Sequence, residues 1–577
     1  MSATTPPRSH AGLVERARLV LSAGLLFLAG FLPGCGRADR AVMAPAEPAA
    51  EVPLFQGLGT HTRQVTTASK DAQTYFDQGL GFMFAFNHDE AIRAFRQAAV
   101  IDPSCAMAWW GVALANGPHI NNTVVPPDRA AAAWEALGRA RGVSAKATDA
   151  ERALIEALAA RYADPQQVNA QPADRAALDH AYADAMRGVW AKHPQDADIG
   201  ALFAEALMDL RPWDLWTPDG QAQPGTDEVL KTLAAVVSFD PNHPLGLHLT
   251  VHAVEMSPTP EKADAAADRL RDLTPGLGHL VHMPSHIDVR RGRWLQAMTA
   301  NEKAMEADRR YNAQVPRQGF YRLYMSHNHH MYAYAAMMVG QSGAALQSID
   351  EMVARMPDDW KQEYAAIADG FTAMPLEVRM RFGRWDEILA APEPPASLPI
   401  ARAMRLYARG VALAAKGQTK EARAEQKAFE SARAAVPAEA IFGNNTGPGI
   451  LAVAADLLEG EIAYREGKVE AGLKALRQAA AAEDALRYDE PPDWILPIRH
   501  ALGAALLQAG KHAEAETVFR DDLKRLPDNG WSLYGLGRAL RLQGKGNEAA
   551  EVEARFKDIW AGADIELKSS CFCQPGV

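Results

Sequence analysis

Residues 75–103 read YFDQGLGFMFAFNHDEAIRAFRQAAVIDP, and this stretch decides the fold. Small and large apolar residues recur in it at helical spacing, in two blocks on either side of the polar turn FNHDEA. Small residues such as Gly79 and Ala91 let two helices approach closely, and large apolar residues fill the space around them. The stretch therefore predicts a tight helix–turn–helix pair, carried by the positions Tyr75, Gly79, Phe82, Ala91, Phe95, Ala98 and Pro103.

The same pattern returns near the other end of the chain. Gly503 and Gly537 are 34 residues apart, and so are Ala515 and Ala549. Self-similarity at a fixed period is the signature of a repeat architecture. Strand-forming patterns are almost absent, so we expect an all-α fold. Weaker copies of the pattern lie between the two ends, at Ala333, Ala345, Pro357, Gly410, Ala422, Gly460 and Ala479.

The 34-residue pattern resembles the tetratricopeptide repeat (TPR) superfamily, clearly over residues 72–105 and 496–560 and loosely over 279–480. The blocks FNHDEAIRAFRQAAVIDPSCAMAWWG, HLTVHAVEMSP, GHLVHMPSHI and SHNHHMYAYAAMM also resemble a poorly characterised group of exported bacterial TPR lipoproteins. The resemblance implies an α-α superhelical solenoid of TPR and TPR-like helix pairs. It also implies a protein or peptide ligand in the concave groove.

The expected organisation follows the chain from end to end. We expect a signal peptide and lipobox (1–35), an Ala/Pro-rich tether (36–65), an N-terminal TPR unit (66–118), an irregular helical region (119–240), a His-rich TPR-like central region (241–360), degenerate repeats (361–480), C-terminal TPR repeats (481–562) and a Cys-containing tail (563–577).

The N-terminus has the features of an export signal. Arg16 and Arg18 precede an apolar run that ends in Leu-Pro-Gly-Cys35. A basic region, a short apolar region and small residues before a cleavage point are typical of secretion. Cys35 resembles the lipobox cysteine of bacterial lipoproteins, which implies lipidation; a plain signal peptide or membrane anchor is the alternative. By the same resemblance, Gly36 implies an outer-membrane location facing the periplasm.

Charge and the lack of other motifs narrow the function. The formal net charge is −11 and no basic stripe is visible, so we expect no nucleic-acid partner. No second long apolar run appears after the signal, so we expect membrane contact through the lipid anchor only. The sequence has no nucleophile elbow, Walker loop, dinucleotide fingerprint, HExxH or CxxCH motif.

Histidines mark the candidate site. Nine of the seventeen lie between His243 and His330. In HLTVHAVE, the residues His248, His252 and Glu255 stand at positions i, i+4 and i+7, which share one face of a helix. Imidazole together with carboxylate is a common ligand set for Zn, Cu or Fe.

Two more histidine-rich blocks follow, GHLVHMPSH with His279, His282 and His286, and SHNHH with His327 and His330. The first helices of successive TPR pairs line the concave side, so we expect these histidines to converge in one pocket. Pro284 lies between His282 and His286. If a helix starts at Pro284, His282 precedes that helix and does not share its face with His286. Other residues in these blocks have expected supporting roles: His329 in packing, and Asp288 and Asn328 as hydrogen-bond acceptors behind the ligands.

Two functions from different classes fit this pattern. The first is a lipid-anchored scaffold that binds a protein or peptide partner, with a polar central pocket. The second is a metal-dependent enzyme or metal-handling protein, with Glu255 as a ligand or as a general base. A bound transition metal ion would favour the second function, and a metal-free, hydrogen-bonded lining would favour the first. The candidate ligands are His248, His252, Glu255, His282, His286, His327 and His330.

A second candidate pocket lies in DLRPWDLW. Arginine and tryptophan together can hold an anionic or sugar-like ligand, and a tryptophan-capped helix end is the alternative. His88 and His119 are weaker loop candidates. The pocket residues are Arg211, Trp213, Asp214 and Trp216.

Three cysteines remain besides the lipobox. Cys571 and Cys573 are separated by one residue, which disfavours a disulfide between them. We expect Cys105 to pair with one of the two and staple the tail to the first repeat. Alternatively, the tail offers thiolates to a soft metal such as Cu(I).

Overall fold

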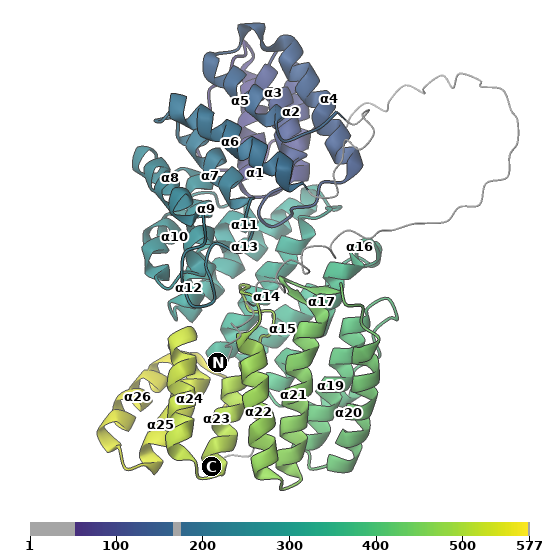
Figure 1. The fold of residues 1–577 in the computed structure, drawn as a ribbon, viewed down its shortest axis with the longest axis vertical. Coiled ribbons are helices and arrows are strands. Elements are labelled where there is room, and N and C mark those ends of the chain that lie inside the picture. The colour runs from purple at the N-terminus through teal and green to yellow at the C-terminus, as the bar shows by residue number, and fades with distance from the viewer. Residues whose placement is uncertain (1–51, 165–174, 575–577) are drawn as a thin grey trace, which may run out of the picture.

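The computed structural model describes residues 52–164 and 175–574, which form α-helices joined by short turns (Figure 1). The predicted signal peptide, Cys35 and the start of the tether lie outside the described residues. The helices of the N-terminal half are α1 (Lys70–Phe84), α2 (His88–Ile101), α3 (Ala106–Ala115), α4 (Pro127–Val143), α5 (Asp149–Ala159), α6 (Ala176–Lys192), α7 (Ala197–Met208), α8 (Thr226–Phe239), α9 (Pro244–Glu255), α10 (Asp264–Leu270), α11 (Gly278–His282), α12 (Pro284–Arg290) and α13 (Trp294–Gln314).

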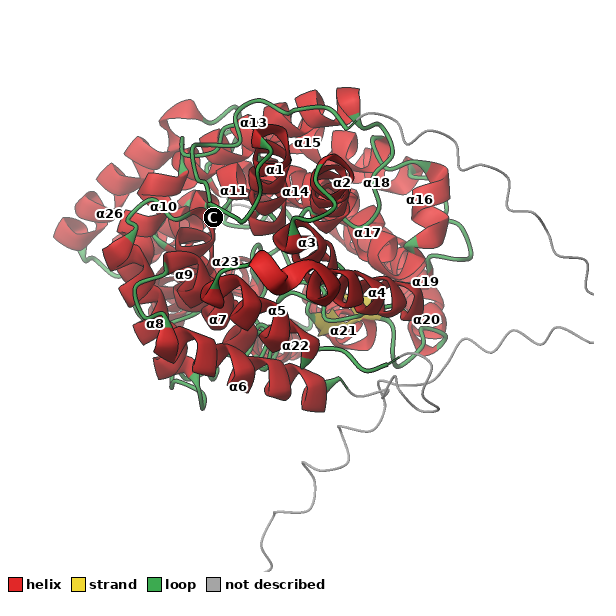
Figure 2. Ribbon diagram, turned by 90° about the horizontal axis from the view of Figure 1, so that it is seen from above, coloured by secondary structure: helices red, strands yellow, loops and turns green. Residues whose placement is uncertain are grey.

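The C-terminal half continues in the same manner. Its helices are α14 (Arg322–Met338), α15 (Ser342–Ala354), α16 (Asp358–Glu363), α17 (Ala365–Arg381), α18 (Trp385–Ala390), α19 (Pro399–Ala415), α20 (Thr419–Ala434), α21 (Gly447–Arg465), α22 (Val469–Asp484), α23 (Ile498–Gln508), α24 (His512–Arg525), α25 (Gly530–Leu542) and α26 (Gly546–Ile559). Strands β1 (Ile441–Phe442) and β2 (Asn445–Thr446) form an antiparallel hairpin beside α21 (Figure 2). The expected all-α fold of paired helices is confirmed.

Two glycines sandwich one phenylalanine at each end of the solenoid. A Cβ on Gly79 or on Gly111 would lie 2.5 Å from the ring of Phe95. The C-terminal repeats have the same arrangement, with Gly503 and Gly535 on either side of the fully buried Phe519 ring. The close approach of consecutive helices therefore depends on residues without a side chain, which is the packing that the repeat pattern predicts.

The solenoid closes on itself. The indole N–H of Trp294 donates to the carbonyl of Pro527 at 2.9 Å, and that of Trp531 donates to the carbonyl of Met337 at 2.7 Å. These bonds join the C-terminal repeats to α13 and α14, which lie about 200 positions earlier in the chain. In Figure 1, α24 accordingly lies below α12. The C-terminal repeats therefore contact the middle of the chain directly, and a cavity lies between the two halves.

The predicted tether is shorter than residues 36–65. From Val52 the chain packs along the N-terminal repeats, because Tyr75 donates to the carbonyl of Val52 and Gly276 donates to that of Gly57. Arg63 then pairs with Asp196 and Asp198 of the α7 start. Residues 52–65 form a bound strap, contrary to the expectation, because their polar groups find fixed partners on the repeats.

Apolar side chains gather into two large cores, one formed mainly by residues 52–325 and the other by residues 289–573. A smaller cluster around α9, α10 and α12 lies beside them. Among the described residues, none of the helices has the length and apolarity to cross a membrane.

Candidate metal centre

Four helices bring the central histidines together. His248 and His252 come from α9, His279 and His282 from α11, His286 from α12, and His327 and His330 from α14. Five of these line a cavity of about 350 Å³ between the two halves of the chain, namely His252, His279, His286, His327 and His330. A cavity of this size suits a small molecule rather than a peptide.

The helix break at Pro284 does not separate His282 from His286. Helix α11 ends at His282 and α12 begins at Pro284, yet the Nε2 atoms of the two histidines are 2.7 Å apart. The short turn through Met283 keeps both rings on the same side. The pair that seemed less certain from the sequence is the closest histidine contact of the site.

Hydrogen bonds at Nδ1 fix which ring nitrogen carries the proton. His248 donates from Nδ1 to the carbonyl of Phe84 at 2.8 Å. His282 donates from Nδ1 to Oδ1 of Asn301 at 2.7 Å, and the amide of Asn301 is oriented by its own donation to the carbonyl of Ala297. A neutral imidazole with its proton on Nδ1 has a lone pair on Nε2, which is the form that binds a metal.

Glu255 fixes two further rings. Its Oε1 accepts from Nδ1 of His252 at 2.7 Å, and its Oε2 accepts from Nδ1 of His286. Two ligand atoms on one tetrahedral ion would be about 3.4 Å apart, given metal–ligand distances near 2.1 Å. The shorter contacts that Glu255 makes are hydrogen bonds that orient two imidazoles. With His252 and His286 it also forms a group whose ligand atoms lie within 4.8 Å of one another, so its role as a metal ligand or a general base stays a prediction.

The nitrogens form two adjacent groups of three. One consists of His248, His252 and His279, and the other of His282, His286 and His327; within each group the ligand atoms lie within 4.8 Å of one another. Glu255 bridges the groups, since it holds His252 of the first and His286 of the second. The expected ligand set omitted His279, although its position three residues before His282 was a usable signal.

Several of the Nε2 atoms lack a protein partner. Those of His248, His252 and His330 are buried and have no hydrogen-bond partner among the described residues, and neither ring nitrogen of His279 has one there. Buried polar groups are normally satisfied. These orphaned nitrogens therefore fit a bound cation or ligand better than they fit a sealed, hydrogen-bonded lining.

Burial keeps most of these rings neutral. It lowers the pKa of His248, His279, His282 and His327 well below 6.5, and that of His330 to about 3. Neutral imidazole is the metal-binding form.

His286 and Glu255 depart from this pattern because they interact with each other. Burial would lower the pKa of His286, but the Glu255 carboxylate raises it above 6.5. Burial would likewise raise the pKa of Glu255, but His286 and His252 bring it down to about 2. In the metal-free protein, a proton on His286 can therefore bridge the two facing Nε2 atoms.

A further group, His61, Asp198 and His243, has the residue types of a metal site but is a hydrogen-bonded clamp. Nδ1 of His243 accepts from the backbone N–H of Gly246, so its Nε2 carries the proton and donates to Asp198 at 3.2 Å. His61 lies 2.9 Å from the same carboxylate oxygen. This group fastens the strap to α7 and α9.

Two residues of the Arg/Trp block reach the histidine site. Arg211 and Trp213 line a small pocket together with His252 and Glu255. Trp213 also lines the large cavity and donates to Oδ1 of Asn121 at 3.0 Å. Asp214 pairs with Arg211, and Trp216 donates to the carbonyl of Ala253, so these two residues support the loop.

The other expected supporting residues lie elsewhere. Asp288 pairs with Arg271 and Arg293, and Asn328 donates to Asp308 at 2.7 Å. The acceptors behind the ligands are instead Glu255, Asn301 and the carbonyl of Phe84, of which the last two have no sequence signal.

The other histidines of the region also have different partners. His329 is held by Ser348, as a packing residue would be. His88 and His119 contact each other, and Phe86 lies between them and His248. His88, His119 and His329 therefore belong to neither group of candidate metal ligands.

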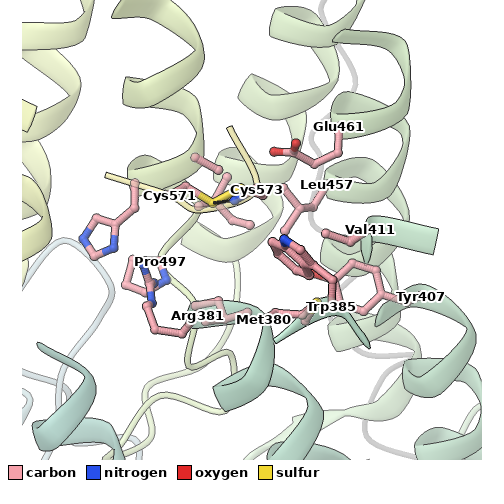
Figure 3. A pocket seen from close by; sticks show the side chains of 14 residues that line it. Met380, Arg381, Trp385, Tyr407, Val411, Leu457, Glu461, Pro497, Cys571 and Cys573 are labelled. Carbon is pink, nitrogen blue, oxygen red and sulfur yellow. Dashed lines mark hydrogen bonds between the residues drawn. A yellow bond between two sulfur atoms is a disulfide. The ribbon is translucent and has the colours of Figure 1, made fainter. Parts of the chain in front are cut away.

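The prediction that Cys105 pairs with the tail is wrong. Cys571 and Cys573 form a disulfide with each other, while Cys105 is a free, buried thiol of the N-terminal core. The tail folds back onto earlier helices, where Asp564 accepts from the backbone N–H of Ser342 at the start of α15 and Gln574 donates to Glu461 of α21. Figure 3 shows the disulfide near Glu461, in a small pocket distant in sequence from Cys105.

The fold and the site together define a helical-repeat protein with a buried, histidine-lined cavity. No protein-family model matches the chain, and no curated protein matches its sequence. Human IFIT1, solved as a dimer with m7Gppp-AAAA, is 13% identical with a TM-score of 0.32, covering 86% of this chain and 92% of that one. The APC/C hetero-tetramer Cut9–Hcn1 matches at 12% identity and a TM-score of 0.30, covering 85% of this chain and 74% of that one.

Proposed function

We propose that the protein is a metal-dependent protein that holds two transition metal ions side by side and presents them to a small molecule in the central cavity. The observation that carries the proposal is the orientation of the imidazoles. His248, His252, His282 and His286 all use Nδ1 as a hydrogen-bond donor, which leaves Nε2 as the nitrogen that can bind a metal. The Nε2 atoms of His248 and His252 have no partner among the described residues, and those of His282 and His286 face each other at 2.7 Å.

Zinc or copper fits this donor set best. Each group offers three imidazoles and no directly bound carboxylate, and imidazole suits Zn, Cu and Fe. Three protein ligands leave a coordination position open, which is typical of catalytic rather than structural sites. A metal-dependent enzyme is therefore favoured over a pure scaffold. A protein or peptide partner, which the repeat fold also suggests, would bind outside this cavity.

Metal stoichiometry tests the proposal. The purified protein, stripped with a chelator and then dialysed against Zn²⁺ or Cu²⁺, should retain two equivalents by elemental analysis. His248→Ala and His327→Ala should each retain one, and the double variant none. His329→Ala is the matched control, because this buried histidine neighbours His327 but bonds to Ser348. Absence of metal from the wild type, or two equivalents in the double variant, would overturn the proposal.

We also propose that the protein is exported and anchored by lipid on Cys35, in the outer membrane facing the periplasm. The support is the signal-like sequence before Cys35, which lies outside the described residues. A radioactive fatty acid should label the wild type when the chain is expressed in a bacterial host. Cys35→Ala should lose the label, whereas Cys105→Ala should keep it. Equal labelling of wild type and Cys35→Ala would refute the anchor.

A further inference from the structure

Beside His286, whose pKa is raised in part by Asp489, one end of the cavity is acidic. Asp489 and Asp493 line it together with the hairpin residues Gly443 and Asn444. Asp489 accepts from the backbone N–H of Asn444 at 3.1 Å, and Asp493 accepts from the side chain of Asn445 at 2.8 Å. The two carboxylates thus have fixed positions, and no lysine or arginine is among the residues that line the cavity.

Gly443 permits this arrangement. Its φ is +55°, and a Cβ there would lie 1.8 Å from a carboxylate oxygen of Asp493 and 2.6 Å from one of Asp489. The hairpin therefore approaches both carboxylates at a position that only glycine fills without a clash. Burial raises the pKa of both carboxyl groups, and the neighbouring Asp489 raises that of Asp493 further, so this acidic end is prone to take up a proton or another cation.

Aromatic side chains also line the cavity. Its walls include Trp213, Phe320, Tyr324, Phe371 and Phe442. Trp213 has a φ of +54°, a strained conformation for a large side chain, and its bond to Asn121 keeps the indole against the cavity. Aromatic faces beside carboxylates recognise organic cations through cation–π and charge-assisted contacts.

A histidine of the same cavity independently indicates a ligand. His330 is 3% exposed, lines the cavity, and its Nε2 has no hydrogen-bond partner among the described residues. A ligand in the cavity would meet histidine nitrogens, or their metal, as well as the two carboxyl groups.

We propose that this cavity binds a small organic ammonium ion, with its apolar or aromatic body between the aromatic walls and its cationic group on Asp489 and Asp493. The proposal deepens the proposed function by naming the ligand class of the same cavity. Its charged end does not involve the metal-binding nitrogens, so binding of the cation is expected even when no metal is present.

The test compares three probes of similar shape by isothermal titration calorimetry: 2-phenylethylammonium, 2-phenylethanol and 3-phenylpropanoate. On the metal-free wild type, the ammonium should bind at least about 10-fold more tightly than the alcohol, since charged hydrogen bonds contribute more than neutral ones. The carboxylate should bind more weakly than both. Equal affinities, or a preference for the anion, would overturn the proposal without any variant.

Variants then test whether the ammonium group binds at Asp489 and Asp493. Asp493→Asn and Asp489→Asn should each remove most of the preference for the ammonium over the alcohol. Asp386→Asn is the control, because this carboxylate is 89% exposed and pairs with Lys416 at the surface. A preference that survives in both cavity variants would refute the assignment.

The same titrations separate this proposal from the metal proposal. An ammonium preference in a protein that retains no metal would refute the metal centre and support the ammonium site. Two bound metals without an ammonium preference would do the reverse. A third metal equivalent that disappears in Asp493→Asn would show that the acidic end takes a metal ion instead, which would overturn the ammonium proposal.

Discussion

Replacing Glu255 by alanine is expected to weaken metal binding at both histidine groups by about 10–100-fold, the usual effect of losing a hydrogen-bond acceptor behind a ligand. The carboxylate is 1% exposed and bonds to His252 in one group and His286 in the other. Without it, both rings lose the acceptor that keeps their proton on Nδ1. Competition with a metallochromic chelator would measure the two affinities.

The Glu255→Gln variant distinguishes the effect of the negative charge from the effect of the hydrogen bonds that orient the two rings. Its carbonyl oxygen can still accept from one ring, but its amide N–H₂ would face the donor Nδ1–H of the other. We therefore expect Glu255→Gln to impair one group strongly and the other weakly. Equal and unchanged affinities at both groups would show that Glu255 does not orient the ligands.

A matched control excludes a general effect of removing a buried carboxylate. Glu377 is fully buried on α17, and neither of its oxygens has a hydrogen-bond partner among the described residues. Glu377→Gln should leave both metal affinities unchanged. Unfolding of each metal-free variant should be followed in parallel, because Glu255→Ala leaves two buried N–H groups unpaired, at roughly 1–3 kcal/mol each.

Replacing Gly503 by leucine is expected to destabilise the C-terminal repeats by about 3 kcal/mol, the upper part of the usual range for overpacking. A Cβ at this position would lie 2.3 Å from the Phe519 ring, and Gly535 confines that ring from the other side. The ring therefore has no free space into which to move. Denaturant-induced unfolding would give the change in free energy.

Hydrogen exchange should locate the effect. Exchange should rise first over residues 496–560 and next in α13 and α14, because Trp294 and Trp531 join these segments. The control is Gly138→Leu in α4, where a Cβ would meet nothing within 4 Å. That change should be neutral or stabilise by up to about 1 kcal/mol, since glycine is a poor helix former. Loosening of the whole chain at once by Gly503→Leu would contradict the repeat packing.

The sequence by itself determined the helical repeats and one face of the site. The spacing of Gly79 and Phe95 encodes how two neighbouring helices pack, and it repeats as Gly503 and Phe519 because the same local contact recurs. Likewise, positions i, i+4 and i+7 placed His248, His252 and Glu255 on one side of α9. These features are local, so the periodicity of the chain suffices to predict them.

The tertiary structure decided what those residues do. Whether Glu255 binds a metal or orients two histidines depends on His286, which is 31 positions away and on another helix. The partner of His248 is the carbonyl of Phe84, 164 positions away, and the acidic end of the cavity comes from a loop near residue 490. Such contacts depend on how successive helix pairs stack and on the closure of the solenoid. Neither leaves a periodic trace in the sequence, because each is made once, between segments distant along the chain.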